Sequence, residues 1–313
     1  MGLHSRQVVY QMGYISVRLV GIGLCALALM VAAADVPFAS TKADRPALPP
    51  EITLAQFVDA IRAKAEAAEN TSGMREGFAA FSTAHHLSPE SIRYSDFVLV
   101  RLLFEATRDA GFWNMHWTIT NQPPNSDNIW RQWESVRNPS PLTPTASAEC
   151  DELSALYAFL AEREGIRGVG LFWPYANHTV AVWVVHPADR PVFRVVVPTS
   201  QIFLDETDFF DTKKFNPWGQ KTIYEYTRRD VPESFELPKA LADYFLRQVD
   251  RYAGASDVTL QKLRYLREGV FLNAWSPHEA ARVALEWRGH PGYTSAEDVA
   301  ALQNFAADMR AGR

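Results

Sequence analysis

Apolar residues first recur at helical spacing shortly after residue 50. This stripe consists of Leu54, Phe57, Val58, Ile61 and Ala65. Thr53 and Gln56 occupy the two positions of a capping box, in which each side chain accepts a hydrogen bond from the other residue's backbone. The pattern predicts an amphipathic helix that begins at this pair and continues to about Glu69.

The next hundred residues alternate between irregular and strongly apolar segments. The segment from Asn70 to Pro89 shows no clear period and is expected to be loop-rich. Residues 97–104 are apolar on nearly all sides, which predicts a buried central helix that Ser95 can cap. Residues 112–146 place tryptophans among Asn, Pro and Ser, and we expect an irregular segment held on the core by these large rings.

The middle third of the chain changes from helical to strand-like periodicity. A helical stripe that follows Cys150 consists of Leu153, Leu156, Tyr157 and Leu160. Gly165 stands where a left-handed residue commonly ends a helix. Three β-rich runs follow, at residues 166–173, 178–185 and 192–197. This order predicts one helix packed on an antiparallel sheet.

The last third keeps a helical period from Leu237 onward, which predicts an all-helical region. Two helix starts fit capping boxes, one formed by Ser276 and Glu279 and the other by Thr294 and Glu297. The predicted fold class is therefore α+β, with N-terminal helices, a helix on an antiparallel sheet and an all-helical C-terminal region.

The amino-terminal segment has the composition of an export signal. Arg6 and Arg18 precede an apolar run at residues 19–34, which closes on three alanines. A membrane-spanning helix needs about 20 apolar residues, so an uncleaved membrane anchor is the less favoured interpretation. We expect residues 1–34 to be a signal peptide and residues 35–52, which are rich in proline and charge, to be a linker.

Charge and cysteine usage narrow the function classes. The formal net charge is −5, and loss of the two arginines in the predicted signal changes it to −7. Because the chain also has no Lys/Arg cluster, strong electrostatic binding to nucleic acid is excluded. Of the two cysteines, Cys25 lies in the predicted signal, so the mature chain has Cys150 alone and forms no internal disulfide.

Cys150 is the best candidate nucleophile. It is expected at a helix N-terminus, after a stretch rich in Pro, Thr and Ser. The thiolate is the reactive form of cysteine, and a helix N-terminus lowers the thiol pKa from its usual value of about 8.5. The free N–H groups of the first turn can also contribute to an oxyanion hole. The alternative is an inert buried thiol, which is common for cysteine.

His178 is the candidate base, because it begins the strand that follows the first strand after the Cys150 helix. A strand packed against that helix can bring an imidazole to sulfur. The alternative for a histidine at a strand start is a surface or capping role. Trp173 and Asn177 are expected to bind substrate, and the alternatives for them are a core or cleft-wall ring and a solvated loop.

Three short motifs in this part of the chain belong together. They are Cys150-Asp151-Glu152-Leu153, the helix end Glu164-Gly165-Ile166-Arg167, and the run His178-Thr179-Val180-Ala181-Val182-Trp183. Over about residues 145–203 the chain resembles the transglutaminase-like superfamily of papain-like cysteine acyltransferases and peptidases. The resemblance implies a papain-like core with Cys150 as nucleophile and His178 as base.

The chain departs from the family's pattern at two positions. Val197 stands where the family usually has an aspartate that orients the imidazole, and Ala148 replaces a usual glycine. Loss of an orienting carboxylate lowers turnover by orders of magnitude in comparable sites. The candidate orienting groups that remain are Thr199, Ser200, Gln201 and Asp205. The other interpretation is that the enzyme is catalytically impaired.

Neither a metal nor a cofactor is predicted. His278 and Glu279 begin a segment that lacks the second histidine of an HExxH motif. His85 and His86 are adjacent, so in a helix they point about 100° apart. No glycine-rich phosphate loop is evident.

The sequence therefore predicts an exported enzyme, periplasmic or secreted, with a transglutaminase-like domain at residues 53–232 and a helical region at residues 233–313. Cys150 would attack an amide or peptide bond and form an acyl-thioester, and hydrolysis by a peptidase or amidase is expected over cross-linking. The alternative is a catalytically impaired binding or scaffold module of the cell envelope. The expected partners are a peptide or protein substrate and an envelope protein held by the C-terminal helices, with no nucleic acid and no stable membrane span after signal cleavage.

Overall fold

The structure is a computed structural model that describes residues 51–108, 115–117, 146–199 and 209–312. All of the described residues belong to one compact unit, Leu48–Arg313. The predicted signal peptide and nearly all of the predicted linker lie outside the described residues, as do Ser200, Gln201 and Asp205. No helix within the described ranges is long and apolar enough to cross a bilayer.

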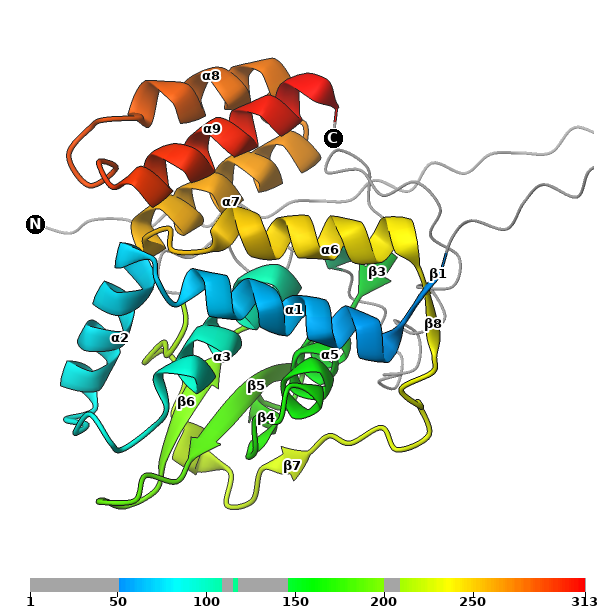
Figure 1. The fold of residues 1–313 in the computed structure, drawn as a ribbon, viewed down its shortest axis with the longest axis vertical. Helices are drawn as coiled ribbons and strands as arrows, with labels where there is room; N and C mark the ends of the chain where they lie inside the picture. Colours follow the sequence, from blue (N-terminus) through cyan, green and yellow to red (C-terminus); the bar gives the residue numbers. More distant parts are fainter. Residues whose placement is uncertain (1–50, 109–114, 118–145, 200–208, 313) are drawn as a thin grey trace, which may run out of the picture. The chain divides into compact units, whose positions relative to one another are not determined.

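The fold is mixed α+β, as the sequence predicts. The first helices are α1 (Leu54–Ala68), α2 (Ser72–Ala84) and α3 (Tyr94–Thr107). The capping box of Thr53 and Gln56 before α1 is confirmed, with the Gln56 amide donating to Thr53 Oγ1 at 3.2 Å. Helix α3 is the predicted central helix and packs on α1, α5 and α6 (Figure 1). It begins at Tyr94, one residue before the expected cap Ser95.

Helix α2 contradicts the expectation of a loop-rich segment between Asn70 and Pro89. Its residues are mostly small or polar, and it buries only Met74 and Phe81. Two buried side chains, seven residues apart, give too sparse a stripe to show a helical period. Helix α2 is therefore stabilised by packing against neighbouring elements, and its own sequence carries no clear helical period.

Helix α5 (Cys150–Arg163) packs on β4 and β5 of a four-stranded antiparallel sheet (Figure 1). The strand order is β6-β5-β4-β7, and the bounds are Val169–Tyr175 for β4, His178–Val185 for β5, Phe193–Val197 for β6 and Tyr224–Glu225 for β7. The helix, the three predicted strands and their antiparallel pairing are confirmed. Two-stranded ladders join β1 (Glu51–Thr53) to β8 (Glu236–Pro238) and β2 (Met115–Trp117) to β3 (Ala146–Ala148).

The carboxyl end of α5 turns sharply at Gly165, which has φ of +83° as predicted. The amides of Gly165 and Ile166 donate to the carbonyls of Glu162 and Ala161, both at 2.9 Å. This is the Schellman pattern, which satisfies carbonyls that would otherwise lack partners. The turn sends β4 back along α5, so the end of β4 lies beside the start of the helix.

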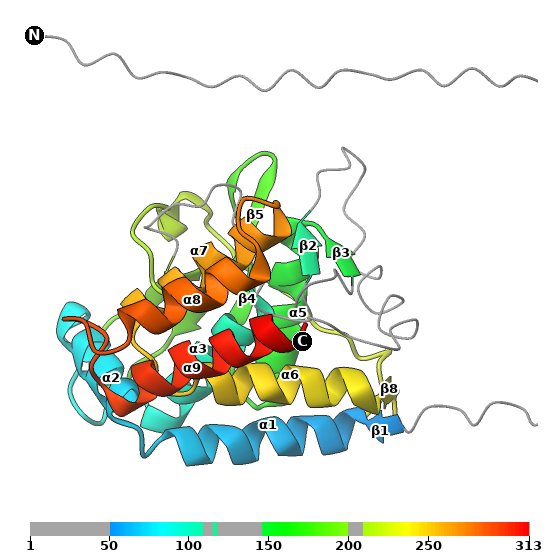
Figure 2. The ribbon, with the colours of Figure 1, turned by 90° about the horizontal axis from the view of Figure 1, so that it is seen from above.

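The C-terminal part is helical, as predicted, with α6 (Lys239–Tyr252), α7 (Asp257–Phe271), α8 (Pro277–Trp287) and α9 (Ala296–Ala311) (Figure 2). Phe245 and Val249 of α6 join the core of α1, α3 and α5, whereas α7, α8 and α9 form a second core. The capping box of Ser276 and Glu279 is confirmed. The other predicted box is wrong by one residue, because α9 is capped by Ser295 through the Asp298 amide.

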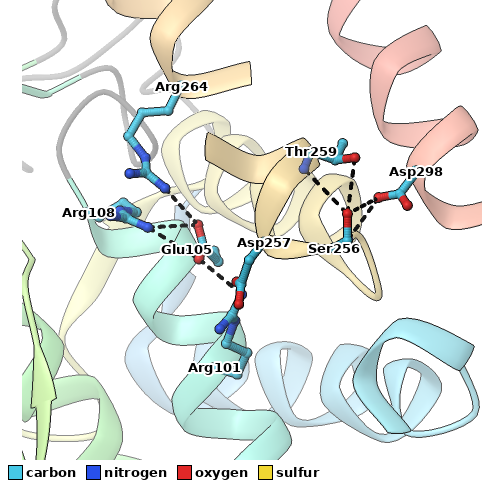
Figure 3. A network of polar contacts seen from close by, with 8 residues as sticks. All are labelled: Arg101, Glu105, Arg108, Ser256, Asp257, Thr259, Arg264 and Asp298. Atoms are coloured by element: carbon cyan, nitrogen blue, oxygen red, sulfur yellow. Dashed lines mark hydrogen bonds and ion pairs between the residues drawn. The ribbon is translucent and has the colours of Figure 1, made fainter. Parts of the chain in front are cut away.

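A buried ionic network links α3 to α7 (Figure 3). The Glu105 carboxylate lies 3.3 Å from Arg108 Nη1, 3.6 Å from Arg101 Nη2 and 4.0 Å from Arg264 Nη2. Arg101 also pairs with Asp257 at the start of α7. Burial raises the pKa of Glu105, but the neighbouring guanidinium groups, Arg108 first, outweigh it and hold this pKa below its usual value.

Candidate functional site at the start of helix α5

Cys150 is the first residue of α5, the position that its sequence context indicates. The preceding residue, Glu149, forms a capping box with Glu152, and the Glu149 amide donates to Glu152 Oε2 at 2.7 Å. The helix start is thus fixed by two carboxylates, which interact favourably with the first-turn N–H groups. The Cys150 side chain is half-buried.

The sulfur atom contacts the start of β5. The backbone amide of Thr179 donates to Cys150 Sγ at 3.3 Å. The β4–β5 register shifts between Phe172 and Tyr175, so Thr179 opposes no single residue of β4. Irregularities of this kind are frequent next to active sites, where they redirect backbone groups. Here the amide is directed to the thiol.

The electrostatic setting of Cys150 differs from the expected one. Burial raises the pKa of its thiol, and the Asp151 carboxylate adds to this rise. Hydrogen bonds from Thr179 and from the Asp151 backbone lower the pKa, but they do not reverse the direction. The expectation of a lowered thiol pKa is therefore wrong, because the helix N-terminus is outweighed by desolvation and by an acid in the first turn. The resting thiol is neutral at pH 7.

His178 is also neutral at pH 7. It is only 4% exposed, and burial, with Lys214 acting in the same direction, lowers its pKa to about 4. Its ring lies 5.6 Å from the Phe215 ring, centroid to centroid. Nδ1 is fully buried and has no hydrogen-bond partner among the residues that the structure describes. A buried polar atom without a partner is unfavourable and is often retained for function.

The contact between Thr179 and Cys150 brings the backbone of His178 close to the thiol. Cα of His178 lies about 2.4 Å from the Thr179 nitrogen across the peptide unit. It therefore lies within about 6 Å of Cys150 Sγ. The imidazole itself packs against Phe215, which belongs with Val180 and Val182 to the apolar cluster on the face of the sheet away from α5. In the described part of the chain, no hydrogen bond joins Sγ to either ring nitrogen, so His178 approaches Cys150 through its backbone and not through its ring.

Two buried hydroxyls, of Ser154 and Thr199, support the start of α5, and the sequence analysis did not predict this supporting role. Ser154 Oγ lies 2.7 Å from the Cys150 carbonyl oxygen and 2.8 Å from Thr199 Oγ1. Ser154 can thus donate to the carbonyl and accept from Thr199. The available signal is spacing, since Ser154 follows Cys150 by four residues and must share its helix face.

The remaining candidates lie in different surroundings. Val197 is fully buried opposite Ala181 in the sheet, so it is a core residue. The Thr199 hydroxyl contacts Ser154, and no hydrogen bond to the His178 ring is present. Trp173 is 41% exposed on β4, and Asn177 is exposed in the turn that joins β4 to β5. Gln201 and Asp205 lie outside the described residues.

No three His, Cys, Asp or Glu side chains are grouped to hold a metal ion in the ranges that the structure describes. No family model, no curated protein and no solved structure matches the chain. Fold and site together define a mixed α+β protein with a half-buried thiol at a helix N-terminus, bonded to the residue that follows a buried neutral histidine.

Proposed function

We propose that this protein is an exported cysteine enzyme of transglutaminase-like, papain-like type that breaks amide bonds through an acyl-thioester on Cys150. One observation carries the proposal. Sγ of Cys150 accepts a hydrogen bond from the backbone amide of Thr179, the residue directly after His178, and within the described ranges the buried Nδ1 of His178 has no partner. The candidate nucleophile and the backbone of the candidate base thus come close together from distant segments, which supports the proposal. Export is supported only by the composition of residues 1–34.

The chemistry follows from the neutral resting state of both groups. As Cys150 Sγ attacks the carbonyl carbon, His178 accepts the thiol proton, so the thiolate forms only during attack. The tetrahedral oxyanion would be stabilised by backbone N–H groups at the start of α5. The C–N bond then breaks, and the imidazolium gives its proton to the leaving amine. Water, activated by the neutral imidazole, hydrolyses the S-acyl bond and regenerates the thiol.

Hydrolysis is favoured over transfer to an amine because water is abundant outside the cytoplasm. The experiment compares purified wild-type, Cys150→Ala and His178→Ala proteins on a peptide library, with products identified by mass spectrometry. The proposal expects cleavage by wild type alone, with a mass gain of one water shared between the two fragments. Equal cleavage by Cys150→Ala would overturn it. An amine-linked product in place of hydrolysis would reassign the enzyme as a transferase.

A second candidate function, a catalytically impaired binding or scaffold module, is favoured by one observation. No orienting group is bonded to the His178 ring within the described residues, and Val197 occupies the position expected for such a group. For this candidate we expect slow alkylation of Cys150, a rate that His178→Ala does not change, and no cleavage. The C-terminal helices would then hold an envelope protein.

A further inference from the structure

Two exposed aromatic rings lie on the sheet beside the candidate site. Trp173 of β4 is 41% exposed and Tyr224 of β7 is 57% exposed. Their ring centroids are 6.2 Å apart and their planes are inclined by 60°. Exposed aromatic rings are favoured contact residues for partners, because they offer a large apolar area with little conformational entropy to lose.

These rings share the face of the sheet on which α5 packs. Tyr224 pairs directly with Leu171 across β7 and β4, and residues opposite each other point to the same face. Leu171 belongs to the core that α5 completes. The ring of Trp173 contacts that of Tyr224, so both rings lie on the face that carries Cys150.

The rings also lie near the end of the sheet where the thiol is found. Phe172 pairs with Val180, so Trp173, the next residue of β4, lies at the register shift beside Thr179, whose amide is bonded to Cys150 Sγ. Neighbouring strands are about 4.8 Å apart, so the rings begin one to two strands, or about 5 to 10 Å, from Thr179. An extended peptide rises about 3.4 Å per residue, so this distance corresponds to roughly two or three residues.

A side-chain bridge from Gln220 and the close approach of β7 to β4 hold the strands that carry the two rings. The Trp173 amide donates to Gln220 Oε1 at 3.0 Å, while Gln220 Nε2 donates to the Thr222 carbonyl at 2.7 Å. A Cβ atom at Gly170 would lie 2.4 Å from the Tyr224 carbonyl oxygen, so glycine is required for β7 to approach β4. The pair is therefore a preformed feature, which reduces the entropy lost on binding.

The chemistry of the pair selects its ligand. The two rings contact each other, and their exposed faces and edges offer a surface against which a third ring can pack edge to face. Both N–H groups of the nearby Gln220 side chain donate to backbone carbonyls, to that of Leu171 at 3.4 Å and to that of Thr222 at 2.7 Å. The ring pair therefore favours an apolar aromatic group, which needs no hydrogen bond from this side chain.

We infer that Trp173 and Tyr224 bind an aromatic side chain of a peptide substrate, about two or three residues from the amide that Cys150 attacks. That the bound peptide is a substrate rests on the proposed function. The binding itself does not require the thiol, so the two can fail separately.

The test uses full-length Cys150→Ala protein and fluorescein-labelled decapeptides in which a single Phe or Ala occupies each position in turn. We expect at least one Phe peptide to bind about tenfold more tightly than its Ala partner, a difference of about 1.4 kcal/mol. Adding Trp173→Ala or Tyr224→Ala should remove this preference. Trp218→Ala is the matched control for the loss of an exposed aromatic ring, because Trp218 is 56% exposed and its ring stacks on the Arg194 guanidinium at 4.3 Å.

The outcomes separate the inference from the proposed function. The inference is overturned if no Phe peptide is preferred, if the preference survives Trp173→Ala, or if a chitin tetrasaccharide binds at the pair and displaces the peptide. If Phe peptides bind at the pair but wild-type protein never cleaves them, the binding site stands and the enzymatic proposal fails.

Discussion

The backbone amide of Thr179 donates a 3.3 Å hydrogen bond to Sγ of Cys150, which joins the first residue of α5 to the second residue of β5. This contact fixes the thiol against the end of the sheet. Burial of the sulfur raises the thiol pKa, and the hydrogen bond from Thr179 lowers it only in part. The same contact makes His178 a neighbour of Cys150 through the backbone rather than through a ring hydrogen bond.

The buried hydroxyl pair behind Cys150 should contribute to stability. Ser154→Ala leaves the Thr199 hydroxyl without its partner, which should lower the free energy of unfolding by about 1 to 3 kcal/mol. Thr199→Val should have a similar effect, and the double variant should lose less than the sum of the two. Urea unfolding measures this, with the exposed Thr83→Ala in α2 as control. Strictly additive losses would contradict the pairing.

Alkylation of Cys150 should respond to Asp151. Because the thiol pKa is raised, wild-type protein should react with iodoacetamide near pH 7 more slowly than a small free thiol. Asp151→Asn removes a carboxylate that raises this pKa, so the rate should increase and the midpoint of the rate profile should move to lower pH. Glu162→Gln, an exposed change farther along α5, should leave both unchanged. A rate that falls in Asp151→Asn would contradict this electrostatic account.

Protonation of His178 should make the protein less stable in acid. Its pKa is about 4 in the folded protein and 6.5 in the unfolded chain, so the unfolded state binds the extra proton between these values. The stability that the folded protein gains from a neutral His178 is fully present above pH 6.5. It is lost as pH falls towards 4, and the free energy of unfolding decreases by up to about 3 kcal/mol.

The measurement compares unfolding of wild type and His178→Gln at several pH values. The stability difference between the two proteins should change in favour of His178→Gln as pH falls from 7 to 4.5, and should stay constant between pH 7 and 8. A difference independent of pH over the whole range would show that His178 is not held neutral by burial.

The ionic network between α3 and α7 should tolerate the loss of its central carboxylate poorly. Glu105→Gln leaves nearby guanidinium groups without their shared counter-charge, and breaking buried pairs of this kind costs about 3 to 5 kcal/mol. The control is Glu286→Gln, whose pair with Arg282 is exposed on α8 and should contribute little. Equal effects of the two substitutions on the melting temperature would contradict the buried role of Glu105.

Local sequence signals predicted the elements that position the thiol. The stripe after Cys150, the helix end at Gly165 and the three β runs each carry a strong short-range pattern, and the structure contains all of them. Helix α2 lacked such a pattern because it buries few side chains. The cap of α9 was misplaced by one residue because Thr294 and Ser295 are each followed, three residues later, by an acid.

The properties of the site depend on contacts that no local pattern contains. A helix N-terminus indicates a lowered thiol pKa, but the depth of burial against β5 sets the opposite direction. The partner of Ser154 is Thr199, 45 residues later in the chain. The pairing of Trp173 with Tyr224 likewise depends on how β7 returns to the edge of β4.

Formation of an acyl-enzyme tests the central proposal most directly. Protein would be mixed with an N-acyl-phenylalanine p-nitrophenyl ester and followed by intact mass and peptide mapping at pH 7. We predict a single transient acyl group on Cys150, absent from Cys150→Ala, that forms at least about 100-fold more slowly in His178→Ala. Acylation at another residue, or an equal rate in wild type and His178→Ala, would contradict the assignment of Cys150 and His178 as nucleophile and base.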